Sequence, residues 1–336
     1  MPTWTLAALD LPLRYTWKIA RNASTAKTNF VATVALANAT GRGEAAPNVR
    51  YGETPALLQA QFAALQANGL AAVASLAAFD ALLLRQPVAH ALRFALEAAL
   101  THALAAQAGQ PVWAFLGVPA PAAAVPTAFS LPIMEPEAVA DFLTEQNAQR
   151  FKLLKVKVNA TDGLALLRAV AAAAPGQPLL VDGNETWATA DAVLAFLQAA
   201  TAIPGLHLRY LEQPLPAAAT AEYERLRPLM TVPLLADESV TDTADFAALA
   251  RQFHGVNVKL MKAGGYRRGI ALLRHTRAHG LLPMLGCMVE TSLGIASALQ
   301  ISALAAVHDL DGMLIVQHEP FGLVTEAAGA LHLVSG

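Results

Sequence analysis

The sequence has few charged residues, a single cysteine and little aromatic content. Charged side chains make up 14% of the 336 residues, hydrophobic ones make up 55%, and the formal net charge is −2. A charge balance this small provides no electrostatic reason to expect nucleic acid or an anionic membrane surface as a partner. The lone Cys287 excludes an internal disulfide and is typical of a reducing compartment.

The high hydrophobic content calls for a search for membrane spans, and the sequence argues against them. The most apolar stretches are interrupted by Asp80 and Arg85 in one case and by Arg93 and Glu97 in another, well short of about 18 uncharged residues. The N-terminal residues have no basic stretch followed by an apolar run, so no signal peptide is expected. We therefore expect a globular, cytoplasmic protein.

Residues 1–122 are expected to form an α+β unit, with strands first and helices after. Strand patterns cover 4–13 and 29–37, a turn is expected at 41–43, and apolar residues at three- and four-residue spacing predict helices within 54–108. Two polar loops are expected at 14–28 and 50–54. Each is either solvated filler, which is the commoner case, or a lid.

From about residue 123, short apolar strands alternate with helical patterns. Eight strands are expected to end near Leu131, Val158, Asp182, Glu212, Asp237, Lys259, Gly286 and Asp309. A βα unit that recurs about every 25 residues predicts a barrel. A doubly wound open sheet is the alternative, but no Gly-x-Gly-x-x-Gly turn opens it. The predicted fold class is α/β: a modified (β/α)8, TIM-like (β/α)7β barrel over 123–312, with an α+β capping domain of 1–122 completed by 313–336.

Lys155 and Lys157 alternate with apolar residues in 154–158, so both lie on one face of a predicted strand. One interpretation is an edge strand whose lysines block aggregation. The other is a functional pair, which needs counter-charges nearby. The next three strands provide them, because Asp182, Glu212 and Asp237 stand at the strand ends, where barrel active sites lie.

Three converging carboxylates repel one another unless a cation binds them, and oxygen ligands suit Mg²⁺. The alternative for each acid alone is a cap on the following helix. Lys157 precedes the acidic strands and Lys259 follows them, so ammonium groups flank the expected metal site. A base on each side of a metal-held carboxylate is what removal and return of a proton at the adjacent carbon requires.

In this order, Lys-x-Lys, the three strand-end acids and Asn-Val-Lys-Leu-Met-Lys-Ala-Gly-Gly at 257–265 resemble the enolase superfamily, muconate-lactonising subgroup. Within it, Met-Leu-Gly-Cys-Met-Val-Glu-Thr at 284–291 and His-Asp-Leu-Asp-Gly at 308–312 are similar to the dipeptide epimerases. The resemblance covers nearly the whole chain. One departure is Asp-Gly-Asn-Glu-Thr-Trp at 182–187 in place of Asp-Ala-Asn-Gln-Gly-Trp, which puts an extra acid, Glu185, near the metal.

The resemblance implies that three carboxylates bind one Mg²⁺ per subunit: Asp182, Glu212 and Asp237. It implies that Lys157 and Lys259 are acid/base residues on opposite faces of the substrate α-carbon, and that Lys155 tunes Lys157 and contacts the substrate carboxylate. Asp309 and Asp311 would receive the α-ammonium group of a dipeptide; the alternative for this pair is a solvated turn. Six further residues are expected to set substrate choice: Lys18, Arg21, Arg50, Ser130, Met288 and Glu290. The cations among them are candidates to meet an anionic side chain.

We therefore predict a Mg²⁺-dependent dipeptide epimerase that transfers a proton at the α-carbon of the C-terminal residue through a metal-stabilised enediolate. The expected substrates are L-Ala-D/L-Glu-like peptides from murein turnover, and a homo-oligomer is compatible with this function. One alternative keeps the fold but changes the chemistry: o-succinylbenzoate synthase, N-acylamino-acid racemase or cycloisomerase. The other is a catalytically silent, metal-stabilised binding protein.

Overall fold

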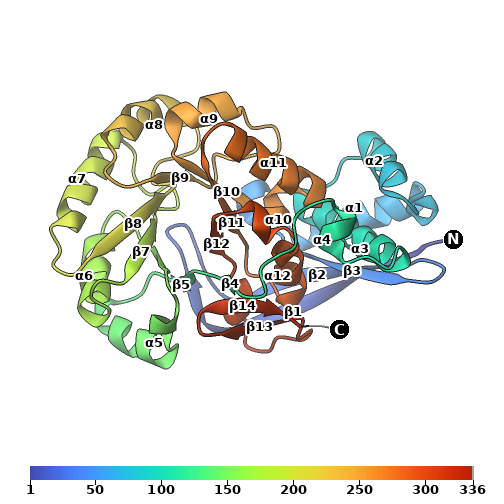
Figure 1. Ribbon diagram of the computed structural model, residues 1–336, viewed down its shortest axis with the longest axis horizontal. Helices are drawn as coiled ribbons and strands as arrows, with labels where there is room; N and C mark the ends of the chain where they lie inside the picture. The colour runs from blue at the N-terminus through green and yellow to red at the C-terminus, as the bar shows by residue number, and fades with distance from the viewer. Residues whose placement is uncertain (335–336) are drawn as a thin grey trace.

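The computed structural model describes residues 1–334, which form an α+β cap beside a parallel barrel (Figure 1). The cap consists of three strands and four helices: β1 (Thr3–Lys18), β2 (Ala23–Ala35), β3 (Thr40–Ala45), α1 (Pro55–Ala67), α2 (Leu76–Arg85), α3 (His90–Gln107) and α4 (Val112–Phe115). The strands pair antiparallel in the order β1-β2-β3, and α3 packs on β2 and β3. Most of α3 is buried, as expected for a helix that is apolar nearly all round.

Gly41 and Gly43 lie within β3, so the prediction of a turn at 41–43 is wrong. The turn falls earlier, where the Leu36 N–H donates to Ala39 O at 2.8 Å. A methyl group on either glycine would overlap the backbone of α3, at the carbonyl of Ala99 in the case of Gly41. The glycines therefore allow the helix to cross the strand at close range.

Residues 14–28 form most of a β-hairpin, so the prediction of a polar loop is also wrong. β1 continues to Lys18, β2 starts at Ala23, and the Ile19 N–H donates to Asn22 O at 2.9 Å across the turn. The β1-β2 ladder is irregular between Pro12 and Trp17. The hairpin extends from the cap to the barrel, where the Ile133 N–H donates to Lys18 O at 2.9 Å (Figure 1).

Eight parallel strands form the barrel in chain order: β5 (Phe129–Leu131), β6 (Leu154–Lys157), β7 (Pro178–Asp182), β8 (His207–Glu212), β9 (Leu234–Ala236), β10 (Gly255–Lys259), β11 (Leu282–Gly286) and β12 (Val307–Asp309). The connections carry the outer helices: α5 (Val139–Glu145), α6 (Gly163–Ala173), α7 (Ala190–Thr201), α8 (Thr220–Leu226), α9 (Phe246–Gln252), α10 (Leu260–Ala263), α11 (Tyr266–Ala278) and α12 (Ser292–Leu299). Within residues 1–334 no α-helix follows β12. The predicted (β/α)7β barrel with an α+β cap is confirmed.

The first and last strands close the barrel without a regular ladder. The Ala128 N–H donates to His308 O at 2.8 Å, and the Leu310 N–H donates to Thr127 Oγ1 at 2.8 Å. The chain then returns to the cap, where the Arg14 N–H donates to Ile315 O at 2.9 Å. Beyond this point β13 (Val324–Ala327) and β14 (Ala330–Leu333) form a sheet with β4 (Val125–Pro126), just before the first barrel strand. The division into a cap of 1–122 plus 313–336 and a barrel of 123–312 stays a prediction, and its last two positions, 335 and 336, lie outside the described residues.

Two polar side chains, the buried Glu44 and the partly buried His102, join the cap to the barrel. The carboxylate of Glu44 in β3 accepts the N–H groups of Thr291 and Gly294, each at 3.0 Å. In α3, the ring of His102 bonds to Arg42 O at 2.7 Å and to Tyr266 Oη in α11 at 2.8 Å. These bonds orient the cap above the ends of the barrel strands.

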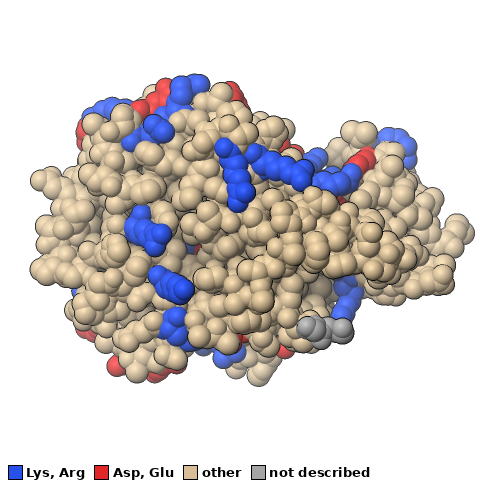
Figure 2. Space-filling view, viewed as in Figure 1, with Lys and Arg blue, Asp and Glu red and all other residues tan. Residues whose placement is uncertain are grey.

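Figure 2 shows Lys and Arg scattered over one face of the molecule, with a short row near the junction of cap and barrel. Uncharged residues cover most of this face. None of the helices in the described part of the chain combines the length and the hydropathy that a membrane crossing needs.

Candidate active site

Three carboxylates stand at the C-terminal ends of neighbouring barrel strands. Asp182 ends β7, Glu212 ends β8, and Asp237 directly follows β9. Asp182 and Glu212 are register partners, and the three residues are only 0%, 0% and 3% exposed. Because parallel strands direct their carboxyl ends to one face of a barrel, residues distant in sequence meet here.

Two lysines of β6 lie among these carboxylates. Lys155 Nζ lies 2.8 Å from Glu212 Oε2 and 3.3 Å from Asp182 Oδ2, and it donates to Asp309 Oδ2 at 2.8 Å. Lys157 Nζ donates to Asp182 Oδ2 at 2.9 Å. β6 lies between β5 and β7, so it is an interior strand and the edge-strand interpretation of Lys155 and Lys157 is wrong.

The third carboxylate is held by two lysines at and beyond the end of β10. Lys259 Nζ donates to Asp237 Oδ2 at 2.9 Å, and Lys262 Nζ donates to Asp237 Oδ1 at 2.6 Å and to the carbonyl of the same residue. The sequence interpretation assigned no role to Lys262. The sequence does carry a signal for Lys262, because it follows Lys259 by three residues where a short helix begins. On a helix, residues three apart are neighbours on one face, so the two lysines could have been expected to lie together.

Burial alone would raise the pKa of the three carboxyl groups, but the lysines reverse this shift for two of them. Burial raises the pKa of Asp182, but the two ammonium groups of β6 outweigh it and hold this pKa below its ordinary value. The pKa of Asp237 is likewise far below its ordinary value, because its two lysines outweigh burial. For Glu212, burial together with repulsion by both aspartates outweighs the ammonium group of Lys155 and raises the pKa to about 7. Burial lowers the pKa of Lys155 and Lys259, yet the surrounding carboxylates hold both above the ordinary value.

The donor set suits a hard divalent cation, although ammonium groups lie between the carboxylates. Within residues 1–334, no three acidic, histidine or cysteine side chains are gathered as a ready-made metal site. Glu212 Oε2 is buried and receives no aligned hydrogen bond from the described residues, despite the nearby ammonium group of Lys155. Carboxylate oxygens on adjacent strands, one of them without a hydrogen-bond donor, are the ligand type that Mg²⁺ takes. The residues therefore fit such an ion by type and by strand position.

Asp309 and Asp311 form a second acidic pair, at the end of β12. Asp311 Oδ2 accepts the Ser130 N–H at 2.6 Å, and Ser130 Oγ donates to Asp309 Oδ1 at 3.5 Å. Burial, and then repulsion by Asp309, raises the pKa of Asp311 to about 7. The two aspartates are 4% and 3% exposed, so the solvated-turn interpretation is wrong.

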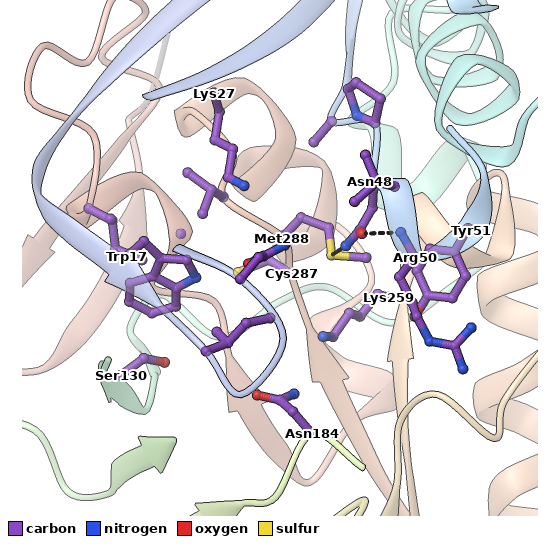
Figure 3. Close-up of a pocket in the computed structure, with 18 of the residues that line it drawn as sticks. Trp17, Lys27, Asn48, Arg50, Tyr51, Ser130, Asn184, Lys259, Cys287 and Met288 are labelled. Carbon is purple, nitrogen blue, oxygen red and sulfur yellow. Dashed lines mark hydrogen bonds between the residues drawn. The ribbon is translucent and has the colours of Figure 1, made fainter. Parts of the chain in front are cut away.

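One cavity of about 500 Å³ lies between the cap and the barrel (Figure 3). Of the charged barrel residues described above, those that line it are Lys155, Lys157, Asp237, Lys259, Asp309 and Asp311. From the cap, Trp17, Asn48 and Tyr51 line it, so the interpretation of the two cap loops as solvated filler is wrong. Figure 3 shows Tyr51 and Lys259 on the same side of the space. The Trp17 ring centre lies 5.7 Å from Lys157 Nζ. Cap and barrel therefore enclose the lysines together.

The residues predicted to set substrate choice divide into two groups. Four of them line the cavity: Arg21, Arg50, Ser130 and Met288. Lys18 and Glu290 do not. Lys18 is exposed because strand alternation turns it away from the side of Trp17. The carboxylate of Glu290 folds back to accept the Met288 N–H at 2.7 Å, and burial raises its pKa to about 8.

Arg21 and Arg50 line the cavity but are already paired with one carboxylate, that of Glu185. Glu185, the acid expected near the metal, is thus turned toward the cap.

Lys27, which the sequence interpretation did not single out, has no such carboxylate partner in the described part of the chain. Its ammonium group donates to Ser24 Oγ at 3.0 Å, burial lowers its pKa, and it forms no ion pair within residues 1–334. It lines the same cavity (Figure 3).

A family model described as Enolase C-terminal domain-like matches residues 137–326. This span contains β6 to β12, and with them the carboxylates and lysines at the ends of these barrel strands. The chain belongs to the enolase superfamily.

Within the superfamily, the resemblance to dipeptide epimerases is confirmed by individual relatives. The L-Ala-D/L-amino acid epimerase of Pedosphaera parvula is 33% identical over 97% of this chain and 94% of its own length. The L-Ala-D/L-Glu epimerase of Escherichia coli is 32% identical over 96% of this chain and 97% of its own length. An enolase family member from Agrobacterium tumefaciens, solved with sodium and L-Ala-L-Glu, aligns with a TM-score of 0.87 at 28% identity and covers 100% of this chain and 98% of its own. The protein is an isomerase of the epimerase type.

Proposed function

We propose that the protein is a Mg²⁺-dependent dipeptide epimerase that transfers a proton at the α-carbon of the C-terminal residue. The observation that carries this proposal is the placement of two lysines around one set of carboxylates. Lys157 on β6 bonds to Asp182 and Lys259 on β10 bonds to Asp237, so the two ammonium groups approach the same cavity from different strands.

Each of the two lysines would serve one face of the substrate. One takes the α-proton as a base, the other gives a proton to the opposite face, and the substrate leaves with inverted configuration and no change in composition. Lys155, on the same strand as Lys157, would hold the substrate carboxylate. One Mg²⁺ per subunit, held by Asp182, Glu212 and Asp237, would supply positive charge for the enediolate oxygens.

The acidic pair at β12 favours a dipeptide over the alternative substrates. A free α-ammonium group needs a carboxylate partner in a buried site, whereas an N-acylated amino acid or a cyclohexadiene acid has no such group. Asp309 and Asp311 both line the cavity within reach of Ser130. We propose that they bind the dipeptide N-terminus.

Lys27 favours an acidic side chain on the dipeptide. It is a cavity-lining cation whose charge no carboxylate of the described chain compensates, and a substrate carboxylate would supply the missing partner. L-Ala-D/L-Glu-like peptides meet this requirement. We propose them as substrates, with a cytoplasmic role in murein peptide turnover; a homo-oligomer is compatible with this role and stays a prediction.

Proton NMR in D₂O with Mg²⁺ and a dipeptide panel that includes Ala-Glu and Ala-Leu tests the proposal. The C-terminal α-proton signal should disappear while the diastereomer appears, and EDTA should stop both until Mg²⁺ is restored. Reaction of succinylated amino acids or cyclohexadiene acids without any dipeptide exchange would shift the assignment to the alternative chemistry. If no panel member is turned over, and neither Lys157→Ala nor Lys259→Ala changes ligand binding, the protein is a catalytically silent binding protein.

A further inference from the structure

Glu185 is a barrel residue whose carboxylate is directed to the cap. It lies in the loop after β7, three residues beyond Asp182, and the backbone φ angles of Asn184 and Glu185 are +44° and +65°. Two successive non-glycine residues in the left-handed region are uncommon, so this loop is held by its surroundings. The Glu185 side chain is only 10% exposed.

Two arginines from separate cap loops bind this one carboxylate. Arg21, in the turn between β1 and β2, places Nη1 2.8 Å from Glu185 Oε2. Arg50, between β3 and α1, donates from Nη2 to Oε1 at 3.0 Å and from Nε to Oε2 at 3.1 Å. The Ala217 N–H, from the loop after β8, also donates to Oε1 at 2.8 Å. Glu185 therefore connects both cap loops to the barrel.

The first loop has two further attachments to the barrel. Arg21 Nη1 donates to Asn184 O at 2.7 Å, and Nη2 lies 2.6 Å from Glu238 Oε1. Both arginines also line the catalytic cavity, so the loops that carry them form part of its wall. Release of these bonds would free the hairpin tip and the second loop on the same side of the cavity.

We propose that Glu185, Arg21 and Arg50 form an ionic clasp that holds the two cap loops closed over the cavity and opens for substrate exchange. An isolated surface ion pair would contribute little to such a closed state. This one is different in three respects: its carboxylate is largely buried, the Arg50 contact is bidentate, and one acid serves two cations. Glu185 acts here as a positioning residue, and the clasp does not depend on which reaction the cavity performs.

Trypsin reports directly on the clasp, because it cleaves after arginine and both clasp arginines must leave Glu185 to be cut. Cleavage after Arg21 and Arg50 is measured by mass spectrometry at native pH for the wild type and for Glu185→Gln. When local opening is fast compared with cleavage, the cutting rate follows the open population. Loss of these charge-assisted bonds should increase both cleavage rates about tenfold.

Glu326→Gln is the matched control. Glu326 lies in β13, after the barrel strands, and pairs at 2.7 Å with Arg150 in the connection between β5 and β6. Neither residue lines the cavity. This variant should not accelerate cleavage after Arg21 or Arg50. Unchanged cleavage in Glu185→Gln, or equal acceleration in both variants, would overturn the clasp.

A kinetic measurement separates the clasp from a general loss of structure. In Glu185→Gln the KM for the best dipeptide should rise about tenfold, since the closed state is less populated, while kcat stays unchanged or rises. Salt should raise the wild-type KM more than that of the variant, because it screens the same ion pairs. A fall in kcat with unchanged KM and a lower melting temperature would show a merely structural role and overturn the proposal.

Discussion

Replacing one of the two lysines tests the two-base arrangement most directly. Lys259→Met removes the ammonium group that contacts Asp237 Oδ2 at 2.9 Å, but Lys262 continues to bind the other oxygen at 2.6 Å. Lys157→Met removes the partner of Asp182, which keeps Lys155 at 3.3 Å. Because neither carboxylate is left alone, the free energy of unfolding should fall by less than the roughly 3–5 kcal/mol that an unpaired buried charge costs.

The expected effect on catalysis is much larger. A positioned general acid or base contributes about 10²–10⁴-fold, so each variant should lose epimerisation by that factor. The remaining lysine still faces one side of the α-carbon. Each variant should therefore exchange the α-proton of one epimer with solvent deuterium, and the two variants should act on opposite epimers.

NMR in D₂O with each pure epimer of Ala-Glu measures both quantities. The exposed Lys152, on the same segment as Lys157, supplies the control variant Lys152→Met, which should behave as wild type. Epimerisation by Lys259→Met at near the wild-type rate, or exchange of the same epimer by both variants, would refute the two-base reasoning.

Three further outcomes are expected. Burial lowers the pKa of His102 to about 4, so as the pH falls the unfolded chain takes up a proton on this residue before the folded protein does. The free energy of unfolding should therefore decrease between about pH 6.5 and 4, by at most roughly 3 kcal/mol. In thermal melts, His102→Gln should make the melting temperature depend less on pH over this range. Gly41→Ala forces a methyl group into the backbone at Ala99 and should destabilise the protein by about 3 kcal/mol, measured by urea unfolding. Lys27→Met should lower kcat/KM for Ala-Glu about 30-fold and leave Ala-Leu nearly unchanged.

The barrel and its strand-end acids were predictable because both depend on local patterns. The βα spacing and the alternation around Lys155 and Lys157 are visible within a few residues, and parallel strands then bring their ends together without further information. The cap was less predictable. A glycine in a strand and a glycine in a turn look alike in sequence, and only the approach of α3 distinguishes them at Gly41.

The specificity residues could not be sorted from sequence for a related reason. Arg21 and Arg50 look like free cations in polar loops, and only the fold brings Glu185, 164 and 135 positions away in the chain, between them. Lys27 lies in a strand and carries no local signal. The role proposed for Lys27 rests on its lack of an ion-pair partner among residues 1–334, which the sequence alone cannot show.

Closure of the cavity and choice of substrate are proposed to depend on different cations: Arg21 and Arg50 for closure, and Lys27 for substrate choice. Arg21 and Arg50 are compensated by Glu185 within the protein, so closure of their loops needs no charge from the substrate. Lys27 lacks such a partner within residues 1–334, so its contribution depends on what the substrate supplies. Glu185→Gln should then raise KM by a similar factor for acidic and neutral dipeptides, whereas Lys27→Met should affect acidic ones alone. A Glu185 variant that discriminated by side-chain charge would show that the arginines themselves bind the substrate, because only freed guanidinium groups could then distinguish Ala-Glu from Ala-Leu.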